Sequence, residues 1–194
     1  MNKYDSYINK ILMESDIDSE YLELAKNPEK NNAELQRMVD ETARASGFAT
    51  TALHQTNSDQ FTQFDISKAR SVGRSRIGFF FTDNPDVEYG RNRMDVYLDV
   101  HNPLEFDTFN DFAVWADLNE TDFGDTASLR KLLLDEGFYD GIEIRGKTDG
   151  FDQTITVAFD PSQIKSADPV TKDDQGQVIP LSKRFDISTE DIRY

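Results

Sequence analysis

The chain lacks cysteine altogether and carries only two histidines among its 194 residues. The absence of cysteine excludes disulfides, thiolate metal sites and cysteine nucleophiles, and it fits a reducing compartment. His54 and His101 alone leave little scope for a zinc site. We therefore expect no metal centre.

Long apolar stretches are also missing. Nowhere does the sequence approach the ~18 consecutive apolar residues that a membrane span needs. Residues 1–5 lack the apolar core of a signal peptide. These absences predict a soluble protein of the cytoplasm that has no membrane partner.

Positive charge is scarce, since 21 lysines and arginines face 37 aspartates and glutamates and leave a net charge of −16. Proteins that bind nucleic acids usually neutralise phosphates with a basic face, so this balance argues against a nucleic-acid partner. Solubility explains the acidic excess. The alternative is a surface that attracts a basic partner.

The front of the chain has helical periodicity. Apolar residues recur at helical spacing over residues 4–12, in a second stretch that ends at Ala25, and in a third that ends at Gly47. We therefore assign residues 1–48 to an N-terminal helical segment. The candidate N-caps are Asp18 or Ser19 for the second helix and Asn31 or Asn32 for the third.

From Thr51 onward the apolar period changes to two, which is typical of half-buried strands. The expected elements are strands at 94–100, ended by Asn102-Pro103, at 141–145 and at 154–159, and helices over 109–117 and from Thr126 or Ser128 to Gly137. Helices in the N-terminal part of the sequence, followed mostly by strands, favour an α+β domain, residues 49–194, over alternating βαβ units.

Three segments carry residues suited to binding chemistry. His54 lies at the end of a short strand with Thr56 on the same side, and it can exchange a hydrogen bond with a ribose hydroxyl or be a satisfied core histidine. Phe80 is the middle residue of a phenylalanine run in which neighbours point to opposite faces, so part of the run is core. Tyr89 can form the opposite wall of a slot, because offset stacking of aromatic rings contributes ~1 kcal/mol.

Two further features are open to two interpretations. Arg74 can approach a pyrophosphate, or it can belong to a solvated loop. The strand at 153–159 has Gln153 and Ile155 on one face, and it is also consistent with an ordinary core strand that ends at Pro161.

Together these segments resemble the histidine–tyrosine–glutamate branch of the ADP-ribosyltransferases, which contains diphtheria toxin and the poly(ADP-ribose) polymerases. His54-Gln55-Thr56 stands where these enzymes have a histidine-glycine-threonine strand. The segment Gly78–Asp83 resembles their glycine-isoleucine-tyrosine-phenylalanine-alanine-aspartate strand, and Tyr89 matches a later tyrosine. Phe159–Ile164 resembles the turn that follows their last, glutamate-bearing strand.

The closer likeness is to the ADP-ribosyltransferase-like modules of phage and mobile-element polyvalent proteins. It covers roughly residues 50–186, and the sequence segments that carry it are 96–104, 139–142, 162–170 and 179–185. The resemblance implies an ADP-ribosyltransferase-like split antiparallel β-sheet core behind the helical segment.

For the site, the resemblance implies that NAD is the substrate. His54 is then expected to hold a ribose of NAD, and Gln55 and Thr56 to grip the dinucleotide beside it. Phe80 and Tyr89 are expected to sandwich the nicotinamide, and Arg74 to reach the pyrophosphate.

Three departures from the family pattern bear on catalysis. Gln55 replaces a glycine, Phe80 replaces a tyrosine, and Ile155 occupies the position of the catalytic glutamate. Gln153, two residues earlier on the same strand face, is the candidate substitute for that glutamate. The candidate catalytic positions are therefore His54, Phe80, Gln153 and Ile155.

The resulting hypothesis is an NAD-dependent mono-ADP-ribosyltransferase, encoded by a phage and acting on a protein acceptor in the host cytoplasm. The first alternative is a catalytically impaired interaction or inhibitor protein on the same scaffold that binds a host factor. The second is an NAD glycohydrolase.

Overall fold

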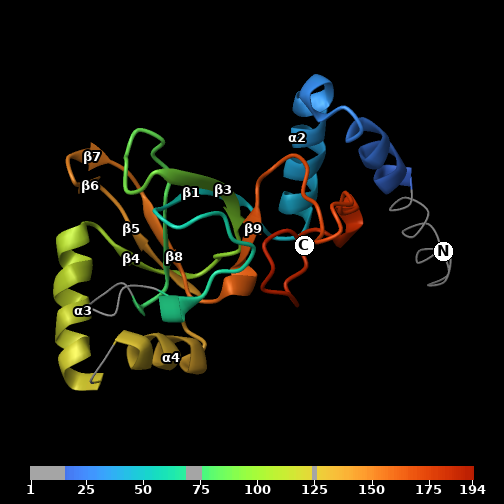
Figure 1. Cartoon of the computed structure of the whole chain (residues 1–194). Coiled ribbons are helices and arrows are strands. Elements are labelled where there is room, and N and C mark those ends of the chain that lie inside the picture. Colours follow the sequence, from blue (N-terminus) through green and yellow to red (C-terminus); the bar gives the residue numbers. More distant parts are fainter. Residues whose placement is uncertain (1–15, 69–75, 124–125) are drawn as a thin grey trace, which may run out of the picture.

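A seven-stranded, mostly antiparallel sheet forms the centre of the computed structural model, which describes residues 16–68, 76–123 and 126–194 (Figure 1). The sheet has the order β4-β5-β8-β2-β1-β3-β9, and β4 and β5 pair in parallel. The strands are β1 (Thr50–Thr56), β2 (Phe79–Thr82), β3 (Asn92–Leu98), β4 (Pro103–Phe106), β5 (Gly141–Ile144), β8 (Ile155–Ala158) and β9 (Ile164–Ser166). The predicted α+β class is confirmed.

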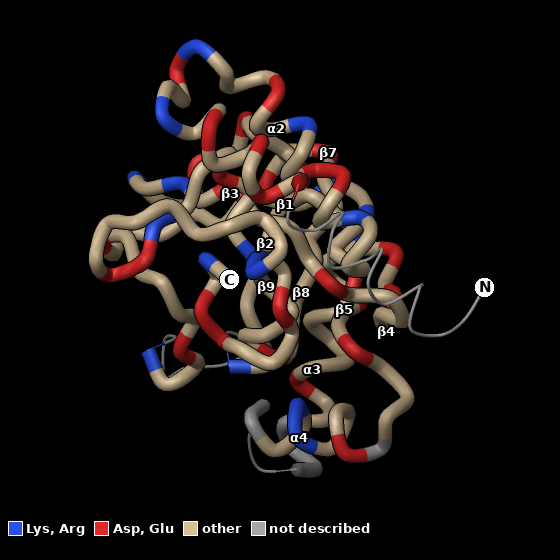
Figure 2. Tube along the Cα trace, turned by 90° about the vertical axis from the view of Figure 1, so that its right-hand side faces the viewer, with Lys and Arg blue, Asp and Glu red and all other residues tan. Residues whose placement is uncertain are grey.

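Helices cover opposite ends of the sheet. Figure 1 shows α2 (Pro28–Ala45) beside β9, and α3 (Phe109–Phe123) and α4 (Thr126–Glu136) at the other end. Within the described residues, no helix combines the length and the apolar character that crossing a membrane requires. Acidic residues are spread along the trace, with fewer basic residues among them (Figure 2).

The register of the central strands divides their side chains between two faces. Leu53 of β1 pairs with Thr82 of β2, so these two side chains share a face. Because side chains alternate along a strand, His54 lies on one face and Phe80 on the other. This division decides how the predicted site residues can meet.

Each face has its own core. On the face of His54, Phe79, Phe81 and Val96 pack with Phe64 and Ile192. The opposite core lies under α3 and α4, and its members include Phe112, Leu129, Ile142, Ile155 and Val157.

A third core joins the N-terminal helices to the rest of the chain. Tyr21 and Leu35 pack with Tyr97 of β3 and with Phe185 near the end of the chain. The hydroxyl of Tyr97 donates to Asp40 of α2, and the Gln36 amide donates to the carbonyl oxygen of Ala167 (3.2 Å). The helical segment therefore packs against the β3–β9 end of the sheet.

The helix starts differ from those predicted. Residues 16–24 are helical, so that helix is under way before Asp18 or Ser19, and Asp18 instead accepts hydrogen bonds from the backbone and hydroxyl of Ser182. Helix α2 begins at Pro28 rather than after Asn31 or Asn32, because proline suits the first helical turn. The helix expected over 4–12 lies outside the described residues.

The predicted end of α2 is confirmed. The helix stops at Ala45 and Gly47 adopts φ +98°, a conformation that glycine reaches without steric cost. The backbone amide of Phe48 then donates to the carbonyl oxygen of Ala43 (2.9 Å). After residue 50 in the sequence, the expected helices and strands are present. Helix α3 is longer than predicted, and β3 is displaced two residues toward the N-terminus.

The C-terminal tail, residues 186–194, fastens the segment that follows β1. We call residues 57–68 the wall loop, because they line the cavity described below. The backbone amide of Ile192 donates to the carbonyl oxygen of Thr62 (2.9 Å), and the amide of Ser166 in β9 donates to the carbonyl oxygen of Ile192 (2.7 Å). The tail thus bridges β9 and the wall loop.

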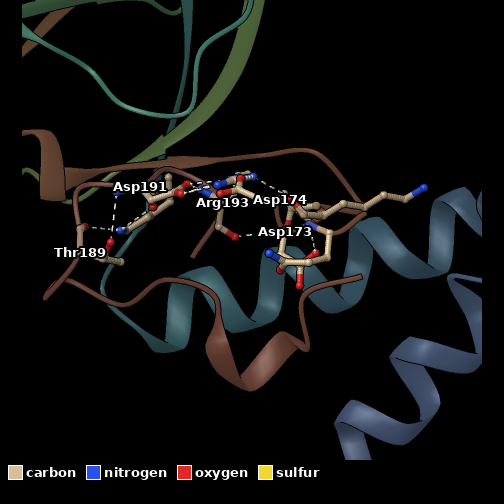
Figure 3. Close-up of polar contacts among 9 residues, drawn as sticks. Asp173, Asp174, Thr189, Asp191 and Arg193 are labelled. Atoms are coloured by element: carbon tan, nitrogen blue, oxygen red, sulfur yellow. Dashed lines mark hydrogen bonds and ion pairs between the residues drawn. The ribbon is translucent and has the colours of Figure 1, made fainter. Parts of the chain in front are cut away.

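Charged side chains hold this tail in place. Figure 3 shows Arg193 between Asp191 and Asp174, with N···O distances of 2.7 and 2.8 Å. The buried amine of Lys165 donates to the carbonyl oxygens of Thr189 (2.7 Å) and Asp191 (3.3 Å). Burial lowers the pKa of Lys165 to about 8, while Asp186 and Asp191 oppose that shift.

We expect Arg193→Ala to lower the free energy of unfolding by about 1.5–3 kcal/mol, because its hydrogen bonds join charged, partly buried groups. The matched control is Arg37→Ala, which removes only exposed ion pairs with Glu34 and Glu41 and should lower the stability much less. Urea denaturation of both variants measures the difference. Equal losses of unfolding free energy in the two variants would contradict the conclusion that Arg193 holds the tail in place.

Candidate active site

His54 is fixed by a hydrogen bond from its own ring. Its Nδ1 lies 3.0 Å from the carbonyl oxygen of Phe80, and because a carbonyl only accepts, Nδ1 carries the proton. The imidazole also meets the rings of Phe64 and Phe81, at centroid distances of 4.9 and 5.5 Å. Strand pairing and aromatic packing together determine where this side chain lies.

The surroundings of His54 favour the neutral imidazole. Burial among the phenylalanines lowers the pKa of His54 below its usual value, and the hydrogen bond to the Phe80 carbonyl oxygen opposes this only in part. The second ring nitrogen, Nε2, then bears a lone pair. Among the described residues, no hydrogen bond engages Nε2, so it can accept one from a hydroxyl.

A cavity of about 540 Å³ opens beside this histidine, within the range typical of small-molecule sites. The end of β1, the wall loop and the start of β2 form its walls. Its lining includes His54, Gln55, Thr56, Phe61, Lys68 and Phe80. The lining therefore combines aromatic surface, hydrogen-bonding groups and a cation.

Phe80 reaches the cavity without presenting its ring to His54. Its carbonyl oxygen binds the imidazole, whereas its ring packs on the opposite face of the sheet, 6.2 Å from Phe112 between centroids. The structure therefore brings His54 and Phe80 together through the backbone. That the Phe80 ring also lines a nicotinamide slot stays a prediction.

Gln55 connects β1 to the segment that carries Tyr89. Its amide nitrogen donates to the carbonyl oxygen of Val87, and its amide oxygen accepts from the backbone amides of Tyr89 and Gly90. A Cβ on Gly90 would lie only 2.6–2.8 Å from the backbone of Thr56, so the close approach requires glycine. The glutamine that replaces the family's glycine thus has a structural use.

Tyr89 and Gln153 are joined directly. The amide nitrogen of Gln153 donates to the Tyr89 hydroxyl (2.8 Å), and that hydroxyl donates to Asp149 (3.0 Å). Burial and the Asp149 charge raise the pKa of Tyr89, while the Gln153 hydrogen bond opposes the rise. Gln153 is buried and accepts from the hydroxyl of Thr82 (2.6 Å).

Of the remaining predicted residues, Ile155 belongs to a hydrophobic core rather than to either group. Ile155 pairs with Thr82 of β2 and is buried in the apolar core under α3 and α4. Arg74 lies outside the described residues. The structure therefore forms one group around His54 and another around Tyr89 and Gln153, with Gln55 between them.

A scan against protein families matches residues 44–173 to the family described as ADP-ribosyltransferase in polyvalent proteins. The chain belongs to this family. No curated protein and no solved structure matches the chain.

The match confirms the resemblance seen in the sequence, and it supports ADP-ribosyl transfer as the class of reaction. In this member of the family the matched range contains every strand from β1 to β9. The C-terminal tail lies beyond the matched range, although it holds the wall loop.

Sequence reasoning missed three contributors to the site. Phe64 and Phe61 enclose the His54 ring, and Asp149 binds Tyr89. The Asp149-Gly150 pair was a usable signal, because this dipeptide favours a two-residue hairpin turn. The two phenylalanines lie in an irregular loop, where periodicity gives no information about contacts.

The burial of His54 makes its titration a test of the site. Above about pH 6.5 the imidazole is neutral in both folded and unfolded chains. As the pH falls, the unfolded chain takes up the proton first, so the stabilisation from neutral His54 is lost below pH 6.5.

We therefore expect an NMR titration to place the His54 midpoint below 6.5, with His54→Asn used to assign the resonance. The free energy of unfolding of the wild type should also fall more steeply than that of His54→Asn between about pH 7 and 5. A midpoint at or above 6.5 would contradict the buried, neutral imidazole.

Proposed function

We propose that this protein is an NAD-dependent mono-ADP-ribosyltransferase, encoded by a phage and modifying a host protein. The observation that carries the proposal is His54, held by the Phe80 carbonyl oxygen at a cavity in a chain of the ADP-ribosyltransferase family. The cytoplasm of the host is the proposed location. Phage origin and a host acceptor follow from the likeness to polyvalent proteins.

The residues present fit the chemistry of NAD. A ribose hydroxyl can donate to Nε2 of His54. The amine of Lys68 lies at the same cavity, 3.7 Å from Asp65, and can move from this exposed ion pair to a pyrophosphate. Tyr89 is 44% exposed, which leaves part of its ring for the nicotinamide. Thr56 contributes a hydroxyl at the end of β1.

The proposed reaction breaks the bond between the ribose C1′ and the nicotinamide nitrogen. The electron pair of that bond passes to the nicotinamide ring, which leaves neutral, and positive charge develops on the ribose. A lone pair of the acceptor then bonds to C1′ and the acceptor proton passes to water. His54 and Tyr89 contribute by orienting NAD for this step.

The position of Ile155 bears on the rate and on the product. No carboxylate is available from this buried residue to stabilise the developing charge. The loss of one such stabilising group costs about 10²–10³ in rate. Slow transfer of a single ADP-ribose is therefore proposed, rather than growth of a chain.

The same observation favours a second candidate, a binding or inhibitor protein on this scaffold. Both Ile155 and the Phe80 ring pack in the apolar core, as they would in a protein that needs no catalytic group there. Partner binding by such a protein would survive His54→Ala and Tyr89→Ala. Loss of partner binding in both variants would reject this candidate.

Incubation with NAD labelled in the adenylate half and a bacterial lysate should label a protein. His54→Ala should reduce the labelling about tenfold or more, because a lost hydrogen bond of about 1.4 kcal/mol is worth that factor. The matched control is His101→Ala, which removes an exposed imidazole paired with Asp99 and should leave the labelling unchanged.

Two other outcomes are informative. Release of nicotinamide without label on any macromolecule would assign NAD hydrolysis instead of transfer. A pure protein that binds NAD but neither transfers nor hydrolyses it would reject the transferase and favour the binding protein.

A further inference from the structure

A carboxylate lies against the predicted NAD-binding tyrosine, although β8 provides none. It belongs to Asp149, in the turn between β6 (Lys147–Thr148) and β7 (Phe151–Asp152). Figure 1 shows this hairpin beside the green loop that follows β2 and carries Tyr89. Two segments that are distant in the sequence therefore meet at the Tyr89 hydroxyl.

The turn fixes the position of Asp149. Asp149 and Gly150 have φ of +53° and +92°, and Thr148 pairs with Phe151 across them. A two-residue hairpin turn with both central residues at positive φ is a tight and strongly preferred geometry, for which Asp-Gly is a favoured sequence. The backbone that carries this carboxylate is thus well defined.

The hairpin is also anchored to the sheet. The carbonyl oxygen of Thr148 accepts from the buried amide of Gln153 (3.1 Å), and the carbonyl oxygen of Asp152 accepts from the side chain of Asn84 (3.0 Å). Gln153 in turn binds both Thr82 and Tyr89. Asp149 and Tyr89 are therefore connected through one continuous set of hydrogen bonds.

The phenol of Tyr89 is held from two sides. It donates to Oδ2 of Asp149 (3.0 Å) and accepts from the amide of Gln153 (2.8 Å), while part of its ring stays exposed. Within the described residues, Asp149 is the only acid that a side-chain hydrogen bond joins to a predicted NAD-contacting residue. Asp65, which also lines the cavity, hydrogen-bonds to Ser67 instead.

We propose that Asp149 is a positioning residue of the NAD site, which holds the Tyr89 ring in the orientation that stacks on the nicotinamide. The nicotinamide ring of NAD is positively charged, and a cation over a tyrosine face is attracted by its electrons. A carboxylate that accepts from the phenol increases electron density in the ring. Asp149 thus favours the charged form of the nicotinamide as well as the orientation of Tyr89.

This inference rests on the proposed function, because it takes Tyr89 as the nicotinamide contact. Calorimetric titration with NAD and with ADP-ribose distinguishes a loss of the nicotinamide contact from a general loss of binding. ADP-ribose shares every part of NAD except the nicotinamide, so a residue that acts through Tyr89 affects NAD alone. A variant that merely disturbed the fold would weaken the binding of both ligands.

We expect Asp149→Ala to weaken NAD binding about three- to tenfold and to leave ADP-ribose binding unchanged. Asp149→Asn keeps a hydrogen-bond acceptor without the charge and should lie between Asp149→Ala and the wild type. In a Tyr89→Ala background, Asp149→Ala should cause no further loss, since the ring through which it acts is gone. Asp152→Ala, an exposed acid on the same hairpin, is the matched control and should bind both ligands normally.

The inference is overturned if Asp149→Ala binds NAD as tightly as the wild type does, or if it loses NAD and ADP-ribose equally. An equal loss in Asp152→Ala would also overturn it. A wild-type protein that fails to bind NAD would refute the proposed function and this inference together, whereas NAD binding that is indifferent to Asp149 refutes this inference alone.

Discussion

The hydrogen bond from His54 to the carbonyl oxygen of Phe80 is the constraint on which the rest of the site depends. It joins a side chain of β1 to the backbone of β2, so turning the imidazole breaks a hydrogen bond between two central strands. Because Nδ1 is used as the donor, Nε2 is left as the acceptor. The aromatic rings around it disfavour the imidazolium and preserve this division of roles.

Alternation along the strands explains why the site consists of two groups. His54 lies on one face, while the side chains of Phe80 and Ile155 turn to the other. Gln153, between β7 and β8, binds Thr82 on that second face. Gln55, the neighbour of His54, lies on that second face and reaches the segment of Tyr89. One dipeptide of β1 thus contacts both groups.

Regular periodicity allowed much of the fold to be predicted. The change of period near Thr51 located the sheet, and Gly47 marked the end of α2, because both depend on local conformation. The start of α2 was missed because Pro28 outweighed the asparagines as a first-turn residue. His54 could be selected from the family resemblance, but its partners could not. Phe64 approaches it only when the wall loop folds back over the sheet, and Phe81 only when β1 pairs with β2. The contact between Tyr89 and Asp149 depends on a hairpin far along the chain, and no local pattern specifies such a meeting.

The C-terminal tail has a consequence for how the protein is divided experimentally. The wall of the cavity is fastened by Ile192 and Arg193, which lie some twenty residues past the last position matched to the family. A fragment trimmed at residue 173 would keep every strand of the sheet and still lose the brace on Thr62. Such a shortened protein would have all of its strands and an unsupported outer wall, so weak ligand binding by the fragment would say little about the full chain.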